Sequence, residues 1–188
     1  MKKLFSFMVV TLDGFQEGPN GEFDWPNVDD EFKDFSVRQM NDIDTLLFGR
    51  LTYDSMAQYW PSPEAIEDSP AIADFMNRIP KAVFSSTLGE ATWANTTLVQ
   101  GDAATAITEL KQQPGTKDLA IFGSPKLTAS LLGAGVVDEV RVMVHPILLG
   151  GGVSLFTGLE DRVKLRHGRT TTFSSGNVLL TYEPVASS

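Results

Sequence analysis

The sequence contains no cysteine and only two histidines, His145 and His167. Without cysteine there is no disulfide, no thiolate nucleophile and no thiolate-bound zinc, and two histidines are too few for a histidine-rich site, so we expect no metal. Basic residues are also scarce, because 15 lysines and arginines stand against 24 acidic residues, a formal net charge of −9. Nucleic acids and anionic membranes bind basic surfaces, so this composition argues against both partners while allowing a local basic pocket.

Long hydrophobic runs are missing as well. No stretch approaches the roughly 20 apolar residues that a membrane-spanning helix needs. The apolar N-terminus, residues 1–10, continues into Asp13-Gly14 without a small-residue cleavage site, so we interpret it as a buried first strand and not as a signal peptide. We expect a cytoplasmic protein with one domain over residues 1–188 and a disordered tail at 185–188.

Short apolar runs alternate with segments of helical periodicity along most of the chain. The strands predicted from this pattern cover residues 4–12, 45–49, 81–86, 97–100, 119–122, 138–149, 163–167, 170–173 and 178–183. The predicted helices cover residues 30–42, 51–59, 65–78, 103–113 and 126–132, with a break at Pro70. Alternating strands and helices followed by a hairpin predict an α/β fold, in which helices cover a mostly parallel sheet with an antiparallel edge.

Two glycines stand where a predicted strand ends and a helix begins. Gly49 ends the strand at 45–49 and precedes Arg50, and Gly123 follows the strand at 119–122. The start of a helix exposes unpaired backbone N–H groups with a partial positive charge, and such groups bind phosphate. Two such turns indicate a ligand with several phosphates, such as a dinucleotide, and Arg50 adds a cation for a further phosphate.

These segments resemble the dihydrofolate reductase superfamily. Gly49-Arg50-Leu51-Thr52 is similar to its Gly-Arg-x-Thr segment, whose arginine faces the adenosine phosphate of NADPH. Ser85-Ser86-Thr87 is similar to the serine-rich strand end beside the adenine ribose, and Gly123-Ser124 with Leu127 is similar to the glycine turn under the pyrophosphate. The resemblance therefore implies NADPH as the cofactor, bound by Gly49, Arg50, Thr52, Ser85, Ser86, Gly123, Ser124 and Leu127. In this interpretation the N–H groups of Gly123 and Ser124 and the Ser124 hydroxyl meet the pyrophosphate.

Two further segments resemble one subgroup, typified by the C-terminal reductase domain of bifunctional riboflavin deaminase-reductases. They are Thr11-Leu12-Asp13-Gly14 and, later in the chain, Asp138-Glu139-Val140 followed by residues 145–152. The resemblance covers residues 3–183 and implies a dihydrofolate reductase-like three-layer fold. That fold has a mostly parallel eight-stranded sheet with an antiparallel C-terminal edge and helices on both faces. The resemblance also implies a homodimer.

A small-molecule substrate would lie beside the nicotinamide of the cofactor. We expect the pocket to be lined by Thr11, Asp13, Trp25 and Ser154, the last as a polar partner of a catalytic acid. Asp13 is also consistent with an ordinary turn beside Gly14, and Trp25 with an ordinary loop anchor. We expect His145 and His167 to be structural.

An acid is expected at the start of the first helix. In folate reductases a single acidic residue there binds the pterin and assists its protonation. Asp29, Asp30 and Glu31 occupy that neighbourhood, and Asp30 and Glu31 are the catalytic candidates. The alternative is that these residues only cap the helix or place charge in its first turn.

The resemblance implies an NADPH-dependent oxidoreductase that reduces a small heterocycle or imine. One candidate is a 5-amino-6-(5-phosphoribosylamino)uracil reductase of riboflavin biosynthesis. Those enzymes carry an Asp-x-Pro-x-Leu-x-x-Arg-like stretch, whereas residues 54–61 contain no arginine. A dihydrofolate or pterin reductase is the second candidate, and a non-catalytic, nucleotide-binding dimeric module that keeps the fold without turnover is the third.

Overall fold

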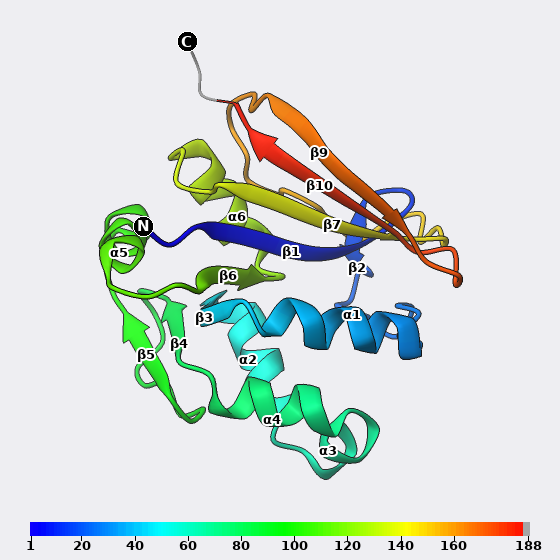
Figure 1. Cartoon of the computed structure of the whole chain (residues 1–188), viewed down its shortest axis with the longest axis horizontal. Coiled ribbons are helices and arrows are strands. Elements are labelled where there is room, and N and C mark those ends of the chain that lie inside the picture. Colours follow the sequence, from blue (N-terminus) through cyan, green and yellow to red (C-terminus); the bar gives the residue numbers. More distant parts are fainter. Residues whose placement is uncertain (186–188) are drawn as a thin grey trace.

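Strand β1 (Leu4–Thr11) lies inside the main sheet, between strands from distant parts of the chain. The computed structural model describes residues 1–185 and contains an eight-stranded sheet in the order β5-β4-β3-β6-β1-β7-β10-β9. The first six strands in this order pair in parallel, whereas β10 is antiparallel to both β7 and β9. The sheet is therefore mostly parallel with an antiparallel C-terminal edge, as predicted (Figure 1).

The remaining elements largely follow the predicted alternation of strands and helices. In chain order they are β2 (Phe15–Glu17), α1 (Asp30–Met40), β3 (Ile43–Gly49), α2 (Arg50–Tyr59), α3 (Pro63–Asp68), α4 (Pro70–Arg78), β4 (Lys81–Phe84), β5 (Thr96–Val99), α5 (Ala103–Gln112), β6 (Asp118–Phe122), α6 (Pro125–Gly133), β7 (Glu139–His145), β8 (Val153–Ser154), β9 (Leu165–Thr172) and β10 (Val178–Pro184).

Two hydrophobic cores, one on each face of the sheet, hold the helices in place. On one face, α1, α2 and α4 share a core with odd-numbered residues of β1, such as Phe7. On the other face, α5 and α6 share a core with even-numbered residues, such as Met8. Successive side chains of a strand point to opposite faces, so one apolar strand supplies both cores. The arrangement confirms the predicted three layers.

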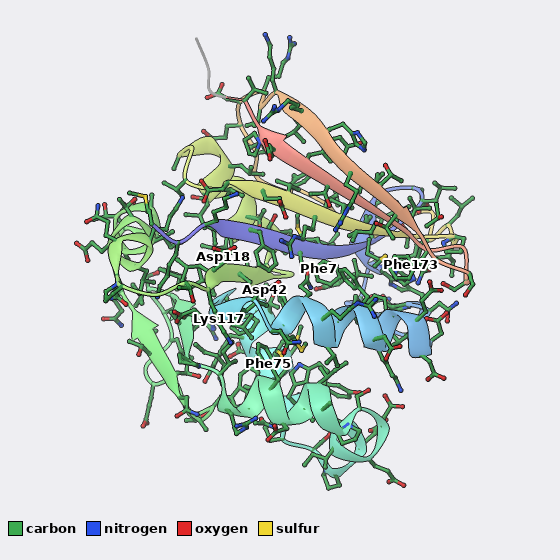
Figure 2. The ribbon with its side chains drawn as sticks, in the orientation of Figure 1. Phe7, Asp42, Phe75, Lys117, Asp118 and Phe173 are labelled. Carbon is green, nitrogen blue, oxygen red and sulfur yellow. The ribbon has the colours of Figure 1, made fainter. Side chains whose placement is uncertain are left out.

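An aromatic cluster connects α1 to the antiparallel edge. The Phe7 ring centroid lies 5.7 Å from those of Phe35 on α1 and Phe122 at the end of β6. Phe35 in turn meets Phe173, in the hairpin between β9 and β10, edge to face at 5.8 Å. Figure 2 labels two members of this cluster, Phe7 and Phe173. Aromatic pairs in this geometry are stabilising beyond the apolar area they bury, so the cluster fixes α1 against both parts of the sheet.

The carboxyl ends of four neighbouring strands meet at one edge of the sheet, because these strands run parallel. The end residues are Gly49 of β3, Phe122 of β6, Thr11 of β1 and His145 of β7. In open α/β sheets, ligands bind in the crevice outside the carboxyl ends of the strands. The fold thus brings the two glycine turns and the expected substrate segments to the same edge.

Proline accounts for two features of the elements. Strand β7 ends at His145 and not at residue 149, because Pro146 lacks the N–H that would continue the ladder. The helix predicted over 65–78 is divided into α3 and α4 at Pro70, which occupies the first position of α4.

The β-structure near both ends of the chain also differs from the prediction. The strands predicted at 163–167 and 170–173 form one strand, β9, in which Gly168 is an extra residue between the pairs Thr181–Arg169 and Tyr182–His167. Strands β2 and β8 pair into a small second sheet that was not predicted. Each is only two or three residues long, too short for an alternating pattern to show.

The expected tail at 185–188 falls mostly outside the described residues. Val185, the last of them, donates its backbone N–H to the Lys164 carbonyl at 2.8 Å, so the chain is still ordered there. No helix within residues 1–185 has the length and apolar character needed to cross a bilayer.

Leu131→Ala is expected to lower the free energy of unfolding by roughly 3 kcal/mol, because the Leu131 side chain on α6 is fully buried and its truncation leaves a cavity. The matched control is Leu12→Ala, at a side chain that is 67% exposed, and its effect should stay below about 0.5 kcal/mol. Urea unfolding followed by circular dichroism measures both. Equal losses in the two variants would contradict the packing of α6 described above.

Candidate cofactor and substrate site

The two glycine turns are in direct contact. The Gly49 N–H donates to the Ser124 hydroxyl at 3.0 Å, and the Ser124 N–H donates to the Thr52 hydroxyl at 3.0 Å. A Cβ on Gly123 would lie 3.2 Å from Cγ2 of Thr52, and Gly123 has a φ of +60°, so both space and backbone conformation favour glycine there. The starts of α2 and α6 are therefore joined at one edge of the sheet, as the sequence analysis required.

The contacts inside this pair of turns decide which N–H groups can reach a ligand. The Gly123 N–H is bonded to the Phe7 carbonyl at 3.0 Å, and the Ser124 N–H to Thr52. The expectation that these two N–H groups meet a pyrophosphate is therefore wrong in this structure, because both are already paired. The available donors are the first-turn N–H groups that follow each turn, at residues 50–52 and 126–127.

The starts of α2 and α6 differ from those of three other helices. Asp29, Ser62 and Asp102 cap α1, α3 and α5 through their side chains, whereas no side chain among residues 1–185 caps α2 or α6. Helix α4, which follows α3 directly, is also uncapped. Uncapped N–H groups carry the positive end of the helix dipole, so the joined starts of α2 and α6 suit an anion with several oxygen atoms.

Arg50 lies beside the serine-rich end of β4, 35 residues further along the chain. Its guanidinium donates to the Thr87 hydroxyl at 2.7 Å and lies 3.5 Å from the Asp54 carboxylate. The Ser85 hydroxyl accepts the N–H groups of Thr87 and Leu88, so it shapes the turn. Ser86 is exposed next to it. The structure thus brings together Arg50 and the serines that the sequence analysis grouped with it.

Asp13 fastens the loop after β7 to the end of β1. Its carboxylate accepts the N–H groups of Leu149 and Gly150, the latter at 2.7 Å, and the Thr11 hydroxyl at 2.6 Å. These bonds, from Thr11 first and then Gly150, hold the pKa of the Asp13 carboxyl below its usual value. Asp13 therefore orders the loop after β7 at this edge of the sheet.

Ser154, the fourth residue expected in the pocket, lies in the small second sheet. Its backbone pairs with Phe15 of β2. Its side chain is exposed and makes no hydrogen bond to Asp30 or Glu31 in the described chain. The structure therefore does not place Ser154 beside either candidate acid.

His145, expected to be structural, lies at the centre of the substrate side, next to Thr11 in the strand register. Its side chain is 1% exposed, and its Nδ1 accepts the Asn27 N–H at 3.1 Å. Trp25 meets it edge to face at 5.6 Å, and Phe32 of α1 lies 6.0 Å away. The signal in the sequence that could have identified His145 as a site residue is a titratable side chain near the carboxyl end of an apolar strand.

The acidic residues at the start of α1 serve different purposes. Glu31 accepts the N–H and the hydroxyl of Ser174 at 2.8 and 2.7 Å, which ties α1 to the β9–β10 hairpin. Asp30 is exposed, with no side-chain bond within residues 1–185. Asp29 caps α1 and its charge acts on His145. The catalytic assignment of Asp30 or Glu31 stays a prediction, and Asp29 is the acid that the fold brings near the buried histidine.

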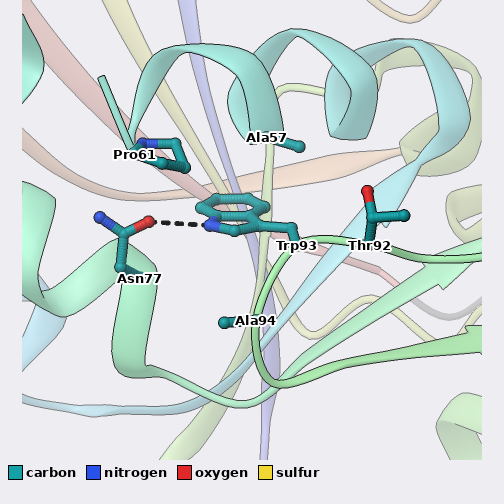
Figure 3. Close-up of a pocket in the computed structure, with 6 residues that line it drawn as sticks. All are labelled: Ala57, Pro61, Asn77, Thr92, Trp93 and Ala94. Atoms are coloured by element: carbon teal, nitrogen blue, oxygen red, sulfur yellow. Dashed lines mark hydrogen bonds between the residues drawn. The ribbon is translucent and has the colours of Figure 1, made fainter.

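A hollow of about 370 Å³ lies elsewhere, at the far end of α2 from Gly49. It is lined by Ala57, Pro61, Asn77, Thr92, Trp93 and Ala94 (Figure 3). The indole N–H of Trp93 donates to Oδ1 of Asn77 at 2.8 Å, so these two polar groups of the wall already have partners. The hollow contains no residue of the predicted site.

Comparison with known proteins agrees with this geometry. The family model described as the RibD C-terminal domain matches residues 2–179, nearly the whole chain. The chain belongs to this family. It is 36% identical over 187 residues to the uncharacterized protein YyaP of Bacillus subtilis (strain 168), covering 96% of this chain and 94% of that protein.

Solved structures with a similar fold were also found. A putative riboflavin biosynthesis protein from Shewanella sp. PV-4 superimposes with a TM-score of 0.75 at 27% identity, covering 98% of this chain and 99% of the other. The Thermotoga maritima diaminohydroxyphosphoribosylaminopyrimidine deaminase/5-amino-6-(5-phosphoribosylamino)uracil reductase gives a TM-score of 0.69 at 14% identity, covering 98% of this chain and 57% of that longer one.

The same fold extends to dihydrofolate reductase. The Enterococcus faecalis enzyme, solved with NADP(H) and RAB-propyl, gives a TM-score of 0.58 at 14% identity, covering 97% of this chain and 96% of that one. The predicted family and the dihydrofolate reductase-like fold are thus confirmed.

The stability of the protein should fall as the pH drops below 6.5. Burial lowers the pKa of the His145 imidazole below its usual 6.5, although the Asp29 carboxylate opposes this shift. The unfolded chain therefore binds a proton that the native protein does not, and native stability present above pH 6.5 is lost as the pH falls from 6.5 towards the native pKa.

His145→Asn, which cannot titrate but keeps an acceptor for the Asn27 N–H, is the matched variant for this prediction. Its stability should depend less on pH in the same window, as measured by urea unfolding at a series of pH values. Identical slopes in the two proteins would show that another group titrates there.

Proposed function

We propose that this protein is an NADPH-dependent reductase of a small heterocycle or imine, resembling the 5-amino-6-(5-phosphoribosylamino)uracil reductases. The observation that carries the proposal is the contact between the Gly49 and Gly123 turns, which sets two uncapped helix starts side by side next to Arg50. Membership of the RibD C-terminal domain family supports it. When bound, NADPH supplies the hydride, and the chain supplies binding and orientation.

The cofactor residues divide between the two ends of the coenzyme. The first turns of α2 and α6 would hold the pyrophosphate through backbone N–H groups, with Gly123 and Ser124 shaping the turn between them. Arg50 and Ser86 would hold the adenosine phosphate. A guanidinium forms charge-assisted hydrogen bonds to phosphate, which favours NADPH over NADH.

The substrate would lie on the other side of the β1 carboxyl end. There Asp13 fixes Leu149 and Gly150, and Trp25 and Phe32 offer aromatic surfaces to a flat ring. The start of α1 would deliver the proton, through Asp30 or Glu31 as the sequence predicts, or through Asp29, whose charge acts on His145. The homodimer implied by the resemblance stays a prediction, which analytical ultracentrifugation would measure.

Two alternatives remain in the proposal. A dihydrofolate or pterin reductase would use the same fold, and the lack of arginine in residues 54–61 favours it over a phosphoribosylated substrate. The second alternative is a non-catalytic nucleotide-binding module. The acids of α1 favour it, because Glu31 is already bonded to Ser174 and Asp30 is exposed, so neither is held beside a buried substrate as a proton donor.

Arg50→Ala should weaken NADPH binding more than NADH binding, by roughly 1.5–3 kcal/mol, because only NADPH carries the phosphate that the guanidinium would meet. Isothermal titration with both coenzymes measures the difference. Arg78→Ala is the matched control, since Arg78 is also exposed and also pairs with an aspartate four residues away in its helix, Asp74. Equal losses for both coenzymes in Arg50→Ala would remove Arg50 from the phosphate site.

The enzyme itself is tested by adding NADPH with a ribosylaminopyrimidine or a dihydropterin. We expect NADPH to raise the melting temperature and its absorbance to fall when the right substrate is present. Stabilisation without turnover on either substrate would support the binding module. No stabilisation by either coenzyme would overturn the proposed function as a whole.

A further inference from the structure

Two buried N–H donors near the end of β7 have no partner within residues 1–185. They are Nε2 of His145 and the indole Nε1 of Trp25. Because Nδ1 of His145 accepts the Asn27 N–H, the neutral imidazole carries its proton on Nε2, which makes that atom a donor. Buried donors in native proteins are nearly always paired, so these two indicate a group from outside the chain.

The two donors belong to one site. The Trp25 and His145 rings are in edge-to-face contact, with centroids 5.6 Å apart and planes at 82°. His145 is also next to Thr11 across the strand ladder, at the sheet edge where the cofactor turns lie. The two unpartnered donors are therefore on neighbouring side chains at this edge.

The surroundings define the chemistry of the group that would pair with them. Phe32 contacts the histidine ring, and Phe23 contacts the indole with centroids 5.5 Å apart, so the walls are aromatic and suit a flat ring. The charge of Asp29 acts on His145, which disfavours an anion at this point. A neutral acceptor satisfies both conditions, and a ring carbonyl oxygen, with two lone pairs, accepts two N–H groups at once.

We propose that His145 and Trp25 recognise a ring carbonyl oxygen of a planar heterocyclic ligand and so determine which heterocycle this protein accepts. The inference depends on the proposed function only for identifying that ligand as the substrate of a reductase. It adds His145 to the site as a residue that contacts the ligand through Nε2, whereas its Nδ1 positions the loop.

The loop of residues 18–29 lies beside the two donors and has no regular secondary structure. The loop is held near His145 through Asn27, whose N–H donates to the histidine and whose carbonyl accepts from Asn177 at 3.1 Å. Because His145 is 1% exposed and Trp25 belongs to this loop, a ligand enters when the loop opens, and it meets both N–H groups once the loop has closed over it again.

The indole resonances of the wild-type protein give the most direct test. The chain has three tryptophans, and the other two are already paired, Trp60 with the Met56 sulfur at 3.0 Å and Trp93 with Asn77 at 2.8 Å. The Trp25 indole N–H is the nitrogen-15 NMR signal that survives in both Trp60→Phe and Trp93→Phe. The probes are 5,6-diaminouracil, which has ring carbonyls, and 4,5-diaminopyrimidine, which has none.

On addition of 5,6-diaminouracil, the Trp25 indole proton should move downfield, as hydrogen bonding requires, while the Trp60 and Trp93 signals keep their positions. The carbonyl-free probe should leave all three unchanged. If the Trp25 signal responds to neither probe, or equally to both, the donors are satisfied by water or serve packing alone, and the proposal is overturned.

Variants at the two donors test the same point by affinity. Trp25→Phe keeps the aromatic ring without its N–H, and His145→Asn keeps an acceptor for the Asn27 N–H without a donor at the Nε2 position. Each should weaken binding of 5,6-diaminouracil about tenfold, the scale of one lost hydrogen bond, without changing binding of 4,5-diaminopyrimidine. Trp60→Phe is the control and should bind both probes as the wild type does. Unchanged affinity for 5,6-diaminouracil in both donor variants would overturn the proposal.

NADPH titration of the same samples separates the two hypotheses. If NADPH does not bind but the carbonyl-bearing probe still distinguishes the variants, the proposed function fails and the carbonyl site stands. If NADPH binds and the probe does not distinguish them, the carbonyl site fails alone. A normal thermal melt of each variant shows that its fold is intact.

Discussion

The hydroxyl groups of Thr52 and Ser124 hold the two glycine turns of this protein together. Each accepts a backbone N–H across the contact between the two glycine turns, from Ser124 and Gly49 respectively. Ser124 adopts a left-handed backbone, with φ of +54°, which is unusual for a residue with a side chain, and these bonds stabilise it there. The relative position of α2 and α6 follows from this contact, and with it the position of every other donor in the candidate phosphate site.

The two sides of the site are built on different principles. The candidate phosphate side consists of strand ends and helix starts that both cores of the sheet support, so the packing of whole elements adds to the contact between the turns. The substrate side consists of loops joined by single side chains, namely Asp13 to the loop after β7 and His145 to Asn27. Rigid elements suit a ligand that related proteins share, whereas loops allow related proteins to accept different ligands.

Much of the fold and the two glycine turns of the candidate site could be predicted from the sequence, because their signals are local. A glycine at the end of an apolar run, followed by a helical pattern, is visible in a few consecutive residues, as at Gly49 and Gly123. The break at Pro70, between α3 and α4, is equally local. Such signals depend on neighbouring residues alone, so they need no knowledge of the tertiary structure.

The rest could not be predicted because it depends on partners far apart in the chain. Glu31 is bonded to Ser174 across 143 residues, and Asn27 to His145 across 118. No pattern in the sequence pairs these residues, and the Thr52–Ser124 contact that occupies an expected phosphate donor is of the same kind. The sequence therefore identifies residue types suited to the chemistry, while tertiary contacts decide which of their atoms are free to perform it.

The carboxylate of Asp13 has a further consequence when it is set beside the imidazole of His145. The pKa of Asp13 is held below its ordinary 3.8. The carboxylate therefore stays ionised in mildly acidic solution and keeps its hydrogen bonds from the N–H groups of Leu149 and Gly150. The contact between His145 and Asn27 is lost once the imidazole takes up a second proton, because Nδ1 then donates and no longer accepts. Protonation of His145 thus acts on the loop at Asn27, whereas the loop after β7 stays bonded to Asp13 for as long as that carboxyl is ionised.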